Sequence, residues 1–124
     1  MKILLIDDDA FLRDMYAAKF IEEGNEVESA ENPIVALQKL ETTQDFDVVL
    51  LDMIMPGMTG VELVKAIKEK YPDFGATCIV LSNQGQKEDV SDAMAAGADG
   101  YIIKAESIPS DVVKKVVELV DNKK

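Results

Sequence analysis

The chain contains no histidine, and it has one cysteine among its 124 residues. Without histidine, the protein cannot use an imidazole of its own as a general base, as a metal ligand or as a phosphohistidine. The single Cys78 excludes an internal disulfide, and because it lies inside an apolar run we expect it to be a small core residue. Any chemistry of this chain therefore has to rest on other side chains.

Basic residues are also few, since 13 Lys and Arg stand against 24 Asp and Glu, for a net charge of −11. Nucleic-acid binding by counterion release needs a basic face, so direct binding to DNA or RNA is not expected. The charge fits either plain solubility or a role toward a partner. No apolar stretch approaches the roughly 20 residues of a membrane helix, and no signal-peptide pattern opens the chain. A cytoplasmic location is the expectation.

Apolar residues make up 48% of the chain, which suits a sheet that is covered on both faces. Five strand patterns alternate with five helix patterns, and the helix starts carry capping signals such as Asn32 before Pro33. The strands are expected at about residues 3–6, 25–30, 47–52, 77–82 and 100–103, and the helices at about 10–23, 32–42, 59–71, 88–96 and from 107 onward.

Consecutive βα units demand right-handed crossovers and a parallel sheet with helices on both faces. The predicted fold is therefore α/β: a doubly wound, five-stranded parallel sheet in the order 2-1-3-4-5, flavodoxin-like (βα)5, forming one domain over residues 1–124. In this order strands one and three flank the point where the strand order reverses. Ligands of such sheets bind there, beyond the carboxyl ends of the strands.

Four of the five strand patterns end on a chemically reactive side chain. These endings are Asp7-Asp8-Asp9, Asp52, Ser82 and Lys104. Taken singly, Asp9 fits a helix N-cap and the others fit ordinary loop or surface positions. Taken together they share one sheet edge, which predicts a site for a cation and a phosphoryl group.

Three carboxylates in one pocket repel one another unless a cation neutralises them. A hard divalent ion is the natural partner, and Mg²⁺ is favoured because it accepts one or two carboxylates together with water and a phosphate oxygen. Lys104 can pair with a carboxylate at rest and with a phosphoryl oxygen later, and Ser82 can donate a hydrogen bond to the same oxygen. Asp52 can then act as the nucleophile of an in-line phosphoryl transfer.

At these residues the chain resembles the response-regulator receiver domains, the phosphoacceptor modules of bacterial two-component signalling. The resemblance runs from ILLIDD at 3–8 through DMIMPGMTG at 52–60 to GADGY at 97–101 and Lys104. It implies that Asp52 is phosphorylated by a histidine kinase or a His phosphotransfer domain. It also implies that Asp8, Asp52 and the backbone carbonyl of Ile54 hold Mg²⁺ directly, while Asp7 acts mostly through water.

The resemblance further implies a conformational switch. Ser82 would swing toward the phosphoryl group and Tyr101 would change rotamer, which would remodel the face of the fourth helix, fifth strand and fifth helix that a downstream protein reads. Tyr101 could instead be a plain half-buried strand aromatic. Phe11 and Met15, one turn apart beside the acidic pocket, would suit the docking of a kinase helix if exposed and would be core if buried. The oligomeric state, monomer or phosphorylation-dependent dimer, stays open.

The chain departs from the family pattern at several positions. Ala105 follows Lys104 where the family usually has a proline, often after a cis peptide; a cis bond without proline costs about 3–4 kcal/mol, so this peptide is either trans or strained. Asn83 replaces a small residue and would narrow access to the phosphoryl group. Ile54 and Gln84 occupy positions that influence hydrolysis, and an apolar Ile54 cannot orient water. We therefore expect a long-lived phosphorylated form. Gly57 is expected to be only a turn residue, and so is Gly60.

Competing functions remain open at this stage. In a haloacid-dehalogenase-like phosphatase Asp7 would be the nucleophile and Asp9 the acid/base, but the chain has no cap insertion, and this function leaves the motif around Asp52 unexplained. An FMN-binding flavodoxin would need a Ser/Thr- and Gly-rich loop after the first strand, which is missing. A receiver-shaped scaffold that is never phosphorylated conflicts with the intact acid set. The expected protein is a phosphoacceptor regulator and not an enzyme.

Overall fold

The computed structural model describes residues 1–83, 85–104 and 107–123. Its centre is a parallel sheet with the strand order β2-β1-β3-β4-β5. The strands are β1 (Lys2–Ile6), β2 (Glu26–Ala30), β3 (Val48–Leu51), β4 (Thr77–Ser82) and β5 (Gly100–Ile103). The observed order confirms the fold predicted from the alternating strand and helix patterns.

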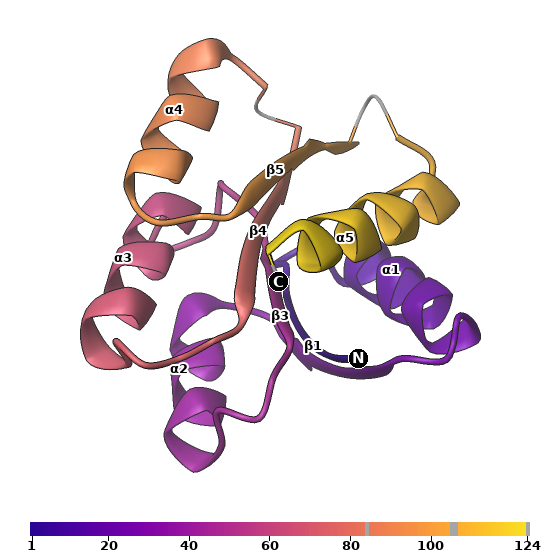
Figure 1. Ribbon diagram of the computed structural model, residues 1–124, viewed down its shortest axis with the longest axis horizontal. Helices are drawn as coiled ribbons and strands as arrows, with labels where there is room; N and C mark the ends of the chain where they lie inside the picture. The colour runs from indigo at the N-terminus through magenta and orange to yellow at the C-terminus, as the bar shows by residue number, and fades with distance from the viewer. Residues whose placement is uncertain (84, 105–106, 124) are drawn as a thin grey trace.

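Helices cover both faces of this sheet, with α1 and α5 on one side and α2, α3 and α4 on the other (Figure 1). Their bounds are α1 (Ala10–Glu22), α2 (Pro33–Thr42), α3 (Gly60–Lys70), α4 (Lys87–Ala95) and α5 (Pro109–Lys123). Within the described ranges, every helix is too short or too polar to cross a bilayer.

The helix starts follow the capping signals of the sequence. The Asn32 side chain accepts a hydrogen bond from the backbone N–H of Val35 at 2.9 Å, directly before Pro33. At α3 the Thr59 hydroxyl accepts from the backbone N–H of Glu62, and the Glu62 carboxylate accepts from that of Thr59. These caps satisfy backbone donors that a helix start would otherwise leave unpaired.

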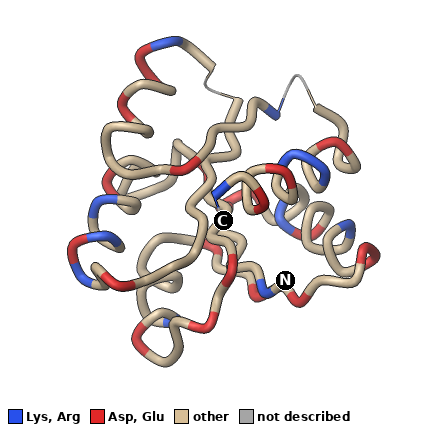
Figure 2. Tube along the Cα trace, viewed as in Figure 1, with Lys and Arg blue, Asp and Glu red and all other residues tan. Residues whose placement is uncertain are grey.

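The core is divided by the sheet into two layers. All four residues of β3 are buried; Val49 and Leu51 pack with the side of α2 and α3, and Val48 and Leu50 pack with the side of α1 and α5. Alternation of side chains along a strand produces this division, and each buried aliphatic side chain stabilises the fold by about 1.5–3 kcal/mol. Charged residues gather on the helices, the connections and the outer strand β2 (Figure 2).

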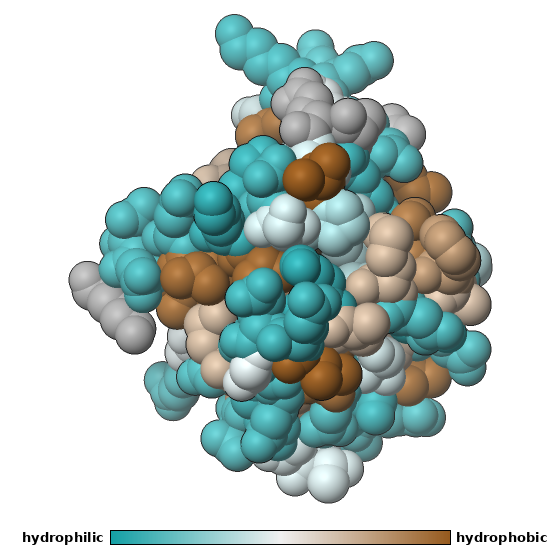
Figure 3. Space-filling view, turned by 90° about the vertical axis from the view of Figure 1, so that its right-hand side faces the viewer, coloured by the Kyte–Doolittle hydropathy of each residue, from teal (hydrophilic) through white to brown (hydrophobic). Residues whose placement is uncertain are grey.

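On the side formed by α1 and α5, hydrophobic residues occupy separate patches with hydrophilic side chains between them (Figure 3). The apolar stripes of these two helices face inward, where α1 buries Tyr16 and Phe20 and α5 buries four valines. Leu119 of α5 packs against the same cluster but is only partly buried.

Candidate functional site

The carboxyl ends of β1 and β3 bring Asp7 and Asp52 side by side. The two strands are neighbours with Ile6 opposite Leu51, and Asp7 and Asp52 are the next residues of each. The backbone N–H of Asp52 donates to the carbonyl oxygen of Ile6 at 3.1 Å, which extends the ladder by one step. With Asp8, these side chains offer three carboxylate oxygens that all lie within 4.8 Å of one another.

Lys104 reaches the same point from the end of β5. Its Nζ lies 2.9 Å from Oδ2 of Asp7 and 3.1 Å from Oδ2 of Asp52, and only 7% of its side chain is exposed. Burial lowers the pKa of Lys104, but the hydrogen bonds and negative charges of Asp7 and Asp52 outweigh it and raise the pKa above its ordinary value. The ammonium therefore stays charged at neutral pH.

Asp7 is held on every side. Its backbone N–H donates to the carbonyl of Ala30 at 3.2 Å, its Oδ1 accepts from the backbone N–H of Asp9 at 2.9 Å, and its Oδ2 accepts from Lys104. Asp7 is also the most enclosed of the three carboxylates, since only 2% of its side chain is exposed against 14% for Asp52. Asp8 is exposed and offers its carboxylate to solvent.

These residues fit a hard divalent cation. Three carboxylates face one ammonium, so the pocket keeps an excess of negative charge. Oxygen donors at this spacing match the preference of Mg²⁺ for one or two carboxylates. The backbone of Ile54 adjoins the same group, since its N–H lies 3.4 Å from Oδ1 of Asp52.

Ser82 and Tyr101 lie beside this pocket on β4 and β5. Ser82 ends β4 with 1% of its surface exposed, and it stands opposite Ile103, the residue before Lys104. Tyr101 is partly buried and packs against a small apolar cluster that includes Met53 and Val80. Burial raises the pKa of Tyr101, while a hydrogen bond with the Ser82 side chain acts in the opposite direction. The two predicted switch residues thus lie close together on neighbouring strands.

Asp9 has a structural role instead. Its side chain accepts a hydrogen bond from the backbone N–H of Leu12 at 3.1 Å and caps the start of α1. An N-cap carboxylate of this kind points into its own helix. The acid/base role that a phosphatase would give Asp9 has no support in this geometry.

A model of the family described as the response regulator receiver domain matches residues 3–117 of the chain. The chain belongs to this family. It is a receiver domain, a phosphoacceptor signalling domain, and the phosphatase alternative is not supported by any of the relatives compared. Receiver domains work with histidine kinases and downstream effectors in two-component systems.

Individual relatives agree with this assignment. A chemotaxis protein CheY of Halobacterium salinarum is 38% identical over 109 residues, which cover 88% of each chain. The transcriptional regulatory protein ResD of Bacillus subtilis is 35% identical over 96% of this chain, which spans only 48% of ResD. A CheY-like receiver domain protein of Methanospirillum hungatei has a solved structure with a TM-score of 0.87 and 32% identity, covering 98% of this chain and 94% of that one.

The two apolar residues predicted beside the pocket of this receiver domain differ in exposure. Phe11 has 75% of its surface exposed, whereas Met15 is partly buried and packs against the core. Of the two, Phe11 is the more exposed. The peptide between Lys104 and Ala105, and the side chain of Gln84, lie outside the residues that the structure describes.

Two residues near the receiver pocket were missed from the sequence. Arg13 donates from Nη1 to the backbone carbonyl of Asp7 at 2.8 Å, and it is the single arginine of the chain, a signal that could have singled it out. Tyr16 is buried on α1; burial raises its pKa, and the charges of Lys104, Asp7 and Asp52 act on it as well. Helical spacing predicts a buried Tyr16 but not its closeness to the charged groups.

The prediction for Gly60 was wrong. Gly57 has a φ of 83° and fits a turn, but Gly60 begins α3 and lies against the end of β3, beside Asp52. A Cβ on Gly60 would come within 2.5 Å of the backbone oxygen of Asp52. Gly60 is therefore a residue of close backbone approach directly behind the pocket.

Proposed function

We propose that Asp52 accepts the phosphoryl group of this receiver domain. The observation that carries the proposal is the position of Lys104, which holds the carboxylates of Asp7 and Asp52 together although the lysine lies 97 residues from the first and 52 from the second. Asp52 is the less buried of the two, since 14% of its side chain is exposed against 2% for Asp7. A phosphoryl donor can reach Asp52 more easily.

The proposed cofactor is Mg²⁺, held by the carboxylates of Asp8 and Asp52 and by the backbone carbonyl of Ile54, with Asp7 acting through water. When bound, the ion would neutralise negative charge on the phosphoryl oxygens. The protein's own part is to hold Asp7 in place through Arg13 and Lys104 and to leave Asp8 open to solvent.

In the proposed transfer, a carboxylate oxygen of Asp52 attacks the phosphorus of a phosphohistidine. The new oxygen–phosphorus bond forms as the bond from phosphorus to the donor's imidazole nitrogen breaks, and that nitrogen leaves with the electron pair. Lys104 then exchanges its contact with Asp52 for one with a phosphoryl oxygen. The step uses one acceptor group per chain, so the protein acts as a regulator that promotes only its own phosphorylation and dephosphorylation.

The proposed output runs through Ser82 and Tyr101 to the face of α4, β5 and α5. A phosphoryl oxygen on Asp52 offers a new acceptor to the Ser82 hydroxyl, which lies close to Tyr101. Rearrangement of this pair would change the face that a downstream protein reads. We propose that residues 1–124 form one receiver domain of this kind, that it acts in the cytoplasm, and that it does not bind nucleic acid directly.

Labelling with a small phosphodonor tests the acceptor. The chain is incubated with acetyl phosphate and Mg²⁺, and the intact mass is measured. We expect the mass of one phosphoryl group on the wild type and none on Asp52→Asn. Asp9→Asn is the matched control. It removes the same single negative charge close to the pocket, and asparagine, like aspartate, can cap the start of α1. A phosphoryl group that persists on Asp52→Asn would refute the assignment.

The donor is proposed to be a His phosphotransfer domain or histidine kinase that docks near Phe11. With a phosphotransfer protein able to label the wild type, Phe11→Glu should lower the transfer rate about tenfold, a loss of roughly 1.4 kcal/mol. Labelling by acetyl phosphate should not change, since a small donor needs no docking surface. Ile21→Glu, an exposed apolar residue at the other end of α1, serves as the control. If Phe11→Glu lowered labelling by the phosphotransfer protein and by acetyl phosphate equally, the defect would lie in the acidic pocket and not in docking.

A further inference from the structure

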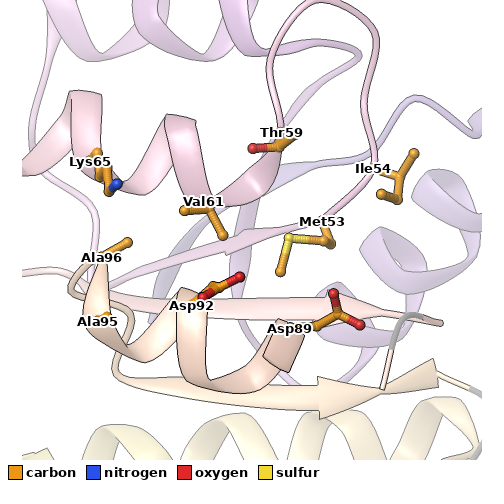
Figure 4. Close-up of a pocket in the computed structure, with 9 residues that line it drawn as sticks. All are labelled: Met53, Ile54, Thr59, Val61, Lys65, Asp89, Asp92, Ala95 and Ala96. Carbon is orange, nitrogen blue, oxygen red and sulfur yellow. The ribbon is translucent and has the colours of Figure 1, made fainter. Parts of the chain in front are cut away.

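A groove of about 510 Å³ lies between α3 and α4 (Figure 4). Its floor contains Met53, which is buried, together with Val61 and Ala96, which are partly buried. This volume falls within the range of binding pockets in proteins. The groove lies on the side of the sheet away from α1, and its lining residues do not include the carboxylates of the acidic pocket.

The small side chains of α4 explain why the space is open. Ala95 and Ala96 line it where α4 passes α3, and an alanine cannot reach across to fill the gap between two helices. The opposite helix contributes the short side chain of Val61. The groove therefore follows from the alanine-rich sequence of α4.

The wall formed by α4 is acidic. Asp89 and Asp92 are three residues apart and so lie on one face of α4, in line with Ala96, the residue that caps the end of the helix. In Figure 4 the carboxylate of Asp92 points from α4 into the groove, and Lys65 stands apart on α3. Asp89 lines the same wall, and its Oδ2 also accepts a hydrogen bond from the backbone N–H of Gln86 at 3.3 Å. In the part of the chain that the structure describes, Asp92 forms no ion pair with a cation of the protein. A bound cationic group would find this carboxylate available.

The groove is continuous with the loop that follows the proposed acceptor. Met53 and Ile54, the two residues after Asp52, form its end nearest to the acidic pocket. Its floor residues Met53 and Val61 belong to the same apolar cluster as Tyr101. An occupant of the groove would touch the backbone segment that carries Asp52.

We propose that the groove between α3 and α4 is a docking site for a short basic amphipathic segment of a partner protein. One apolar side chain of the segment enters over Met53, Val61 and Ala96. A lysine or arginine one helical turn away pairs with Asp92 and Asp89. Charge complementarity selects this occupant, because the two carboxylates of the α4 wall outweigh the one ammonium of Lys65, and the whole chain carries −11. This surface lies beside the α4–β5–α5 face, and the proposal concerns the unphosphorylated chain.

A synthetic peptide tests the groove. The probe is a helical peptide of leucine and lysine about 14 residues long, about four turns, with leucine at every third or fourth position. A second peptide carries glutamate in place of every lysine. Each is titrated into the ¹⁵N-labelled chain, and amide chemical shifts give both the position and the affinity. We expect the lysine peptide to shift the amides of Met53, Val61 and Ala96, and the glutamate peptide to cause no shift there.

Charge variants separate this site from general attraction to an acidic protein. The double variant Asp89→Asn with Asp92→Asn should weaken the lysine peptide at least about tenfold. The control double variant Asp45→Asn with Asp73→Asn removes the same charge from exposed positions at the opposite edge and should change the affinity less than about twofold. Equal weakening by both pairs, or shifts centred on α5, would overturn the docking site.

A packing variant tests the apolar half of the contact. Ala96→Leu fills the groove without changing charge and should abolish the shifts at Met53 and Val61. If this variant does not fold, Val61→Ser leaves the groove open but polar and should weaken the peptide several-fold. Unchanged affinity in a folded variant, or no binding of the lysine peptide to the wild type, would also overturn it. Uptake of a beryllofluoride mimic on Asp52, measured separately by ¹⁹F NMR, keeps this outcome distinct from any failure of the phosphoacceptor assignment.

Discussion

Ile54 is the first residue after Asp52 whose side chain stays largely in contact with solvent, with 57% of its surface exposed. This apolar side chain offers no hydrogen bond to a water molecule near Asp52. Because hydrolysis of an acyl phosphate needs water held in line, we expect the phosphorylated form to be long-lived.

The first prediction concerns this lifetime. Ile54→Asn introduces an amide that can orient water and should shorten the lifetime about tenfold, equivalent to roughly 1.4 kcal/mol in the barrier. The measurement is the decay of the phosphorylated chain in Mg²⁺ after removal of acetyl phosphate. Ile34→Asn, at a similarly exposed position on α2, should leave the decay within about twofold of the wild type. Identical decay of the wild type and Ile54→Asn would contradict this role of Ile54.

Arg13 provides a second prediction at the same scale. Its guanidinium donates to the carbonyl of Asp7, so Arg13→Met should release the loop that carries Asp8 and weaken Mg²⁺ binding about tenfold, as loss of an outer support typically does. The direction of the change in Mg²⁺ affinity is informative, because removal of a positive charge would by itself strengthen cation binding. Calorimetric titration with Mg²⁺ alone measures the effect, and Lys19→Met on the same helix is the charge-matched control. Tighter binding in Arg13→Met would show that Arg13 acts only through its charge.

Among the elements, the junction of β3 and α3 is the most constrained by sterics. The backbone N–H of Gly60 donates to the carbonyl of Met53 at 2.8 Å, which brings the first turn of α3 against the residues that follow Asp52. A Cβ here would also lie 2.9 Å from the Cα of Met53, and backbone atoms cannot move aside as a flexible side chain would.

Gly60→Ala should therefore destabilise the fold by about 1–3 kcal/mol. Gly75→Ala is the matched control, since nothing lies within 4 Å of a Cβ at Gly75 and the substitution should be neutral or slightly stabilising. Urea unfolding of both variants measures the difference. A loss below about 0.5 kcal/mol in Gly60→Ala would mean that the junction can relax, and the close approach would then carry no cost.

Local signals account for the elements that the sequence predicted well. Apolar runs placed β1, β3, β4 and β5, and β2 was predicted as a less apolar strand. The side-chain caps Asn32 and Thr59 placed the starts of α2 and α3, because their hydrogen bonds are made within one helical turn. The approach of Gly60 to Asp52 could not be predicted in the same way. It depends on the angle at which α3 leaves the sheet, which no local pattern encodes.

Across the whole molecule, different long-range contacts stabilise the two ends of the sheet, the end where the strands finish and the end where they begin. At the carboxyl ends of the strands, Lys104 forms ion pairs with Asp7 and Asp52. At the other end, Asp99 accepts from the backbone N–H of Cys78 at 2.9 Å and pairs with Lys123 at 3.3 Å. The first set could be predicted because strand order alone brings the strand ends together.

The second set could not be predicted, because it depends on where the last turn of α5 passes the sheet. The exposure of Phe11 and the partial burial of Met15 could not be predicted from the sequence either. Both residues fit the apolar face of α1, and only the position of the neighbouring α5 decides which one the core covers. Strand order is therefore accessible from sequence, whereas the contacts between layers require the packed structure.

The stability of the whole fold gives the last prediction, through the thiol of Cys78. Its side chain is fully buried in β4, and burial raises its pKa above the ordinary value. The unfolded chain has a thiol pKa of about 8.5, so above that pH the unfolded state loses a proton that the folded state retains. Below this pH the thiol is neutral in both states, and its titration does not lower the free energy of unfolding. As the pH rises from there toward the folded pKa, the free energy of unfolding falls, with a limiting slope of about 1.4 kcal/mol per pH unit.

Urea unfolding of the wild type and of Cys78→Ala, measured from pH 7 to pH 10 in the absence of oxidant, should reveal this titration. Alanine leaves a small cavity, so the free energy of unfolding of Cys78→Ala should be lower than that of the wild type at neutral pH. The tyrosines titrate in both proteins, and their effect cancels in the difference. We expect the advantage of the wild type to shrink by about 1 kcal/mol or more between pH 8 and pH 10. Parallel curves would mean that water reaches the thiol in the folded state, and the interior of β4 would then not be closed to solvent.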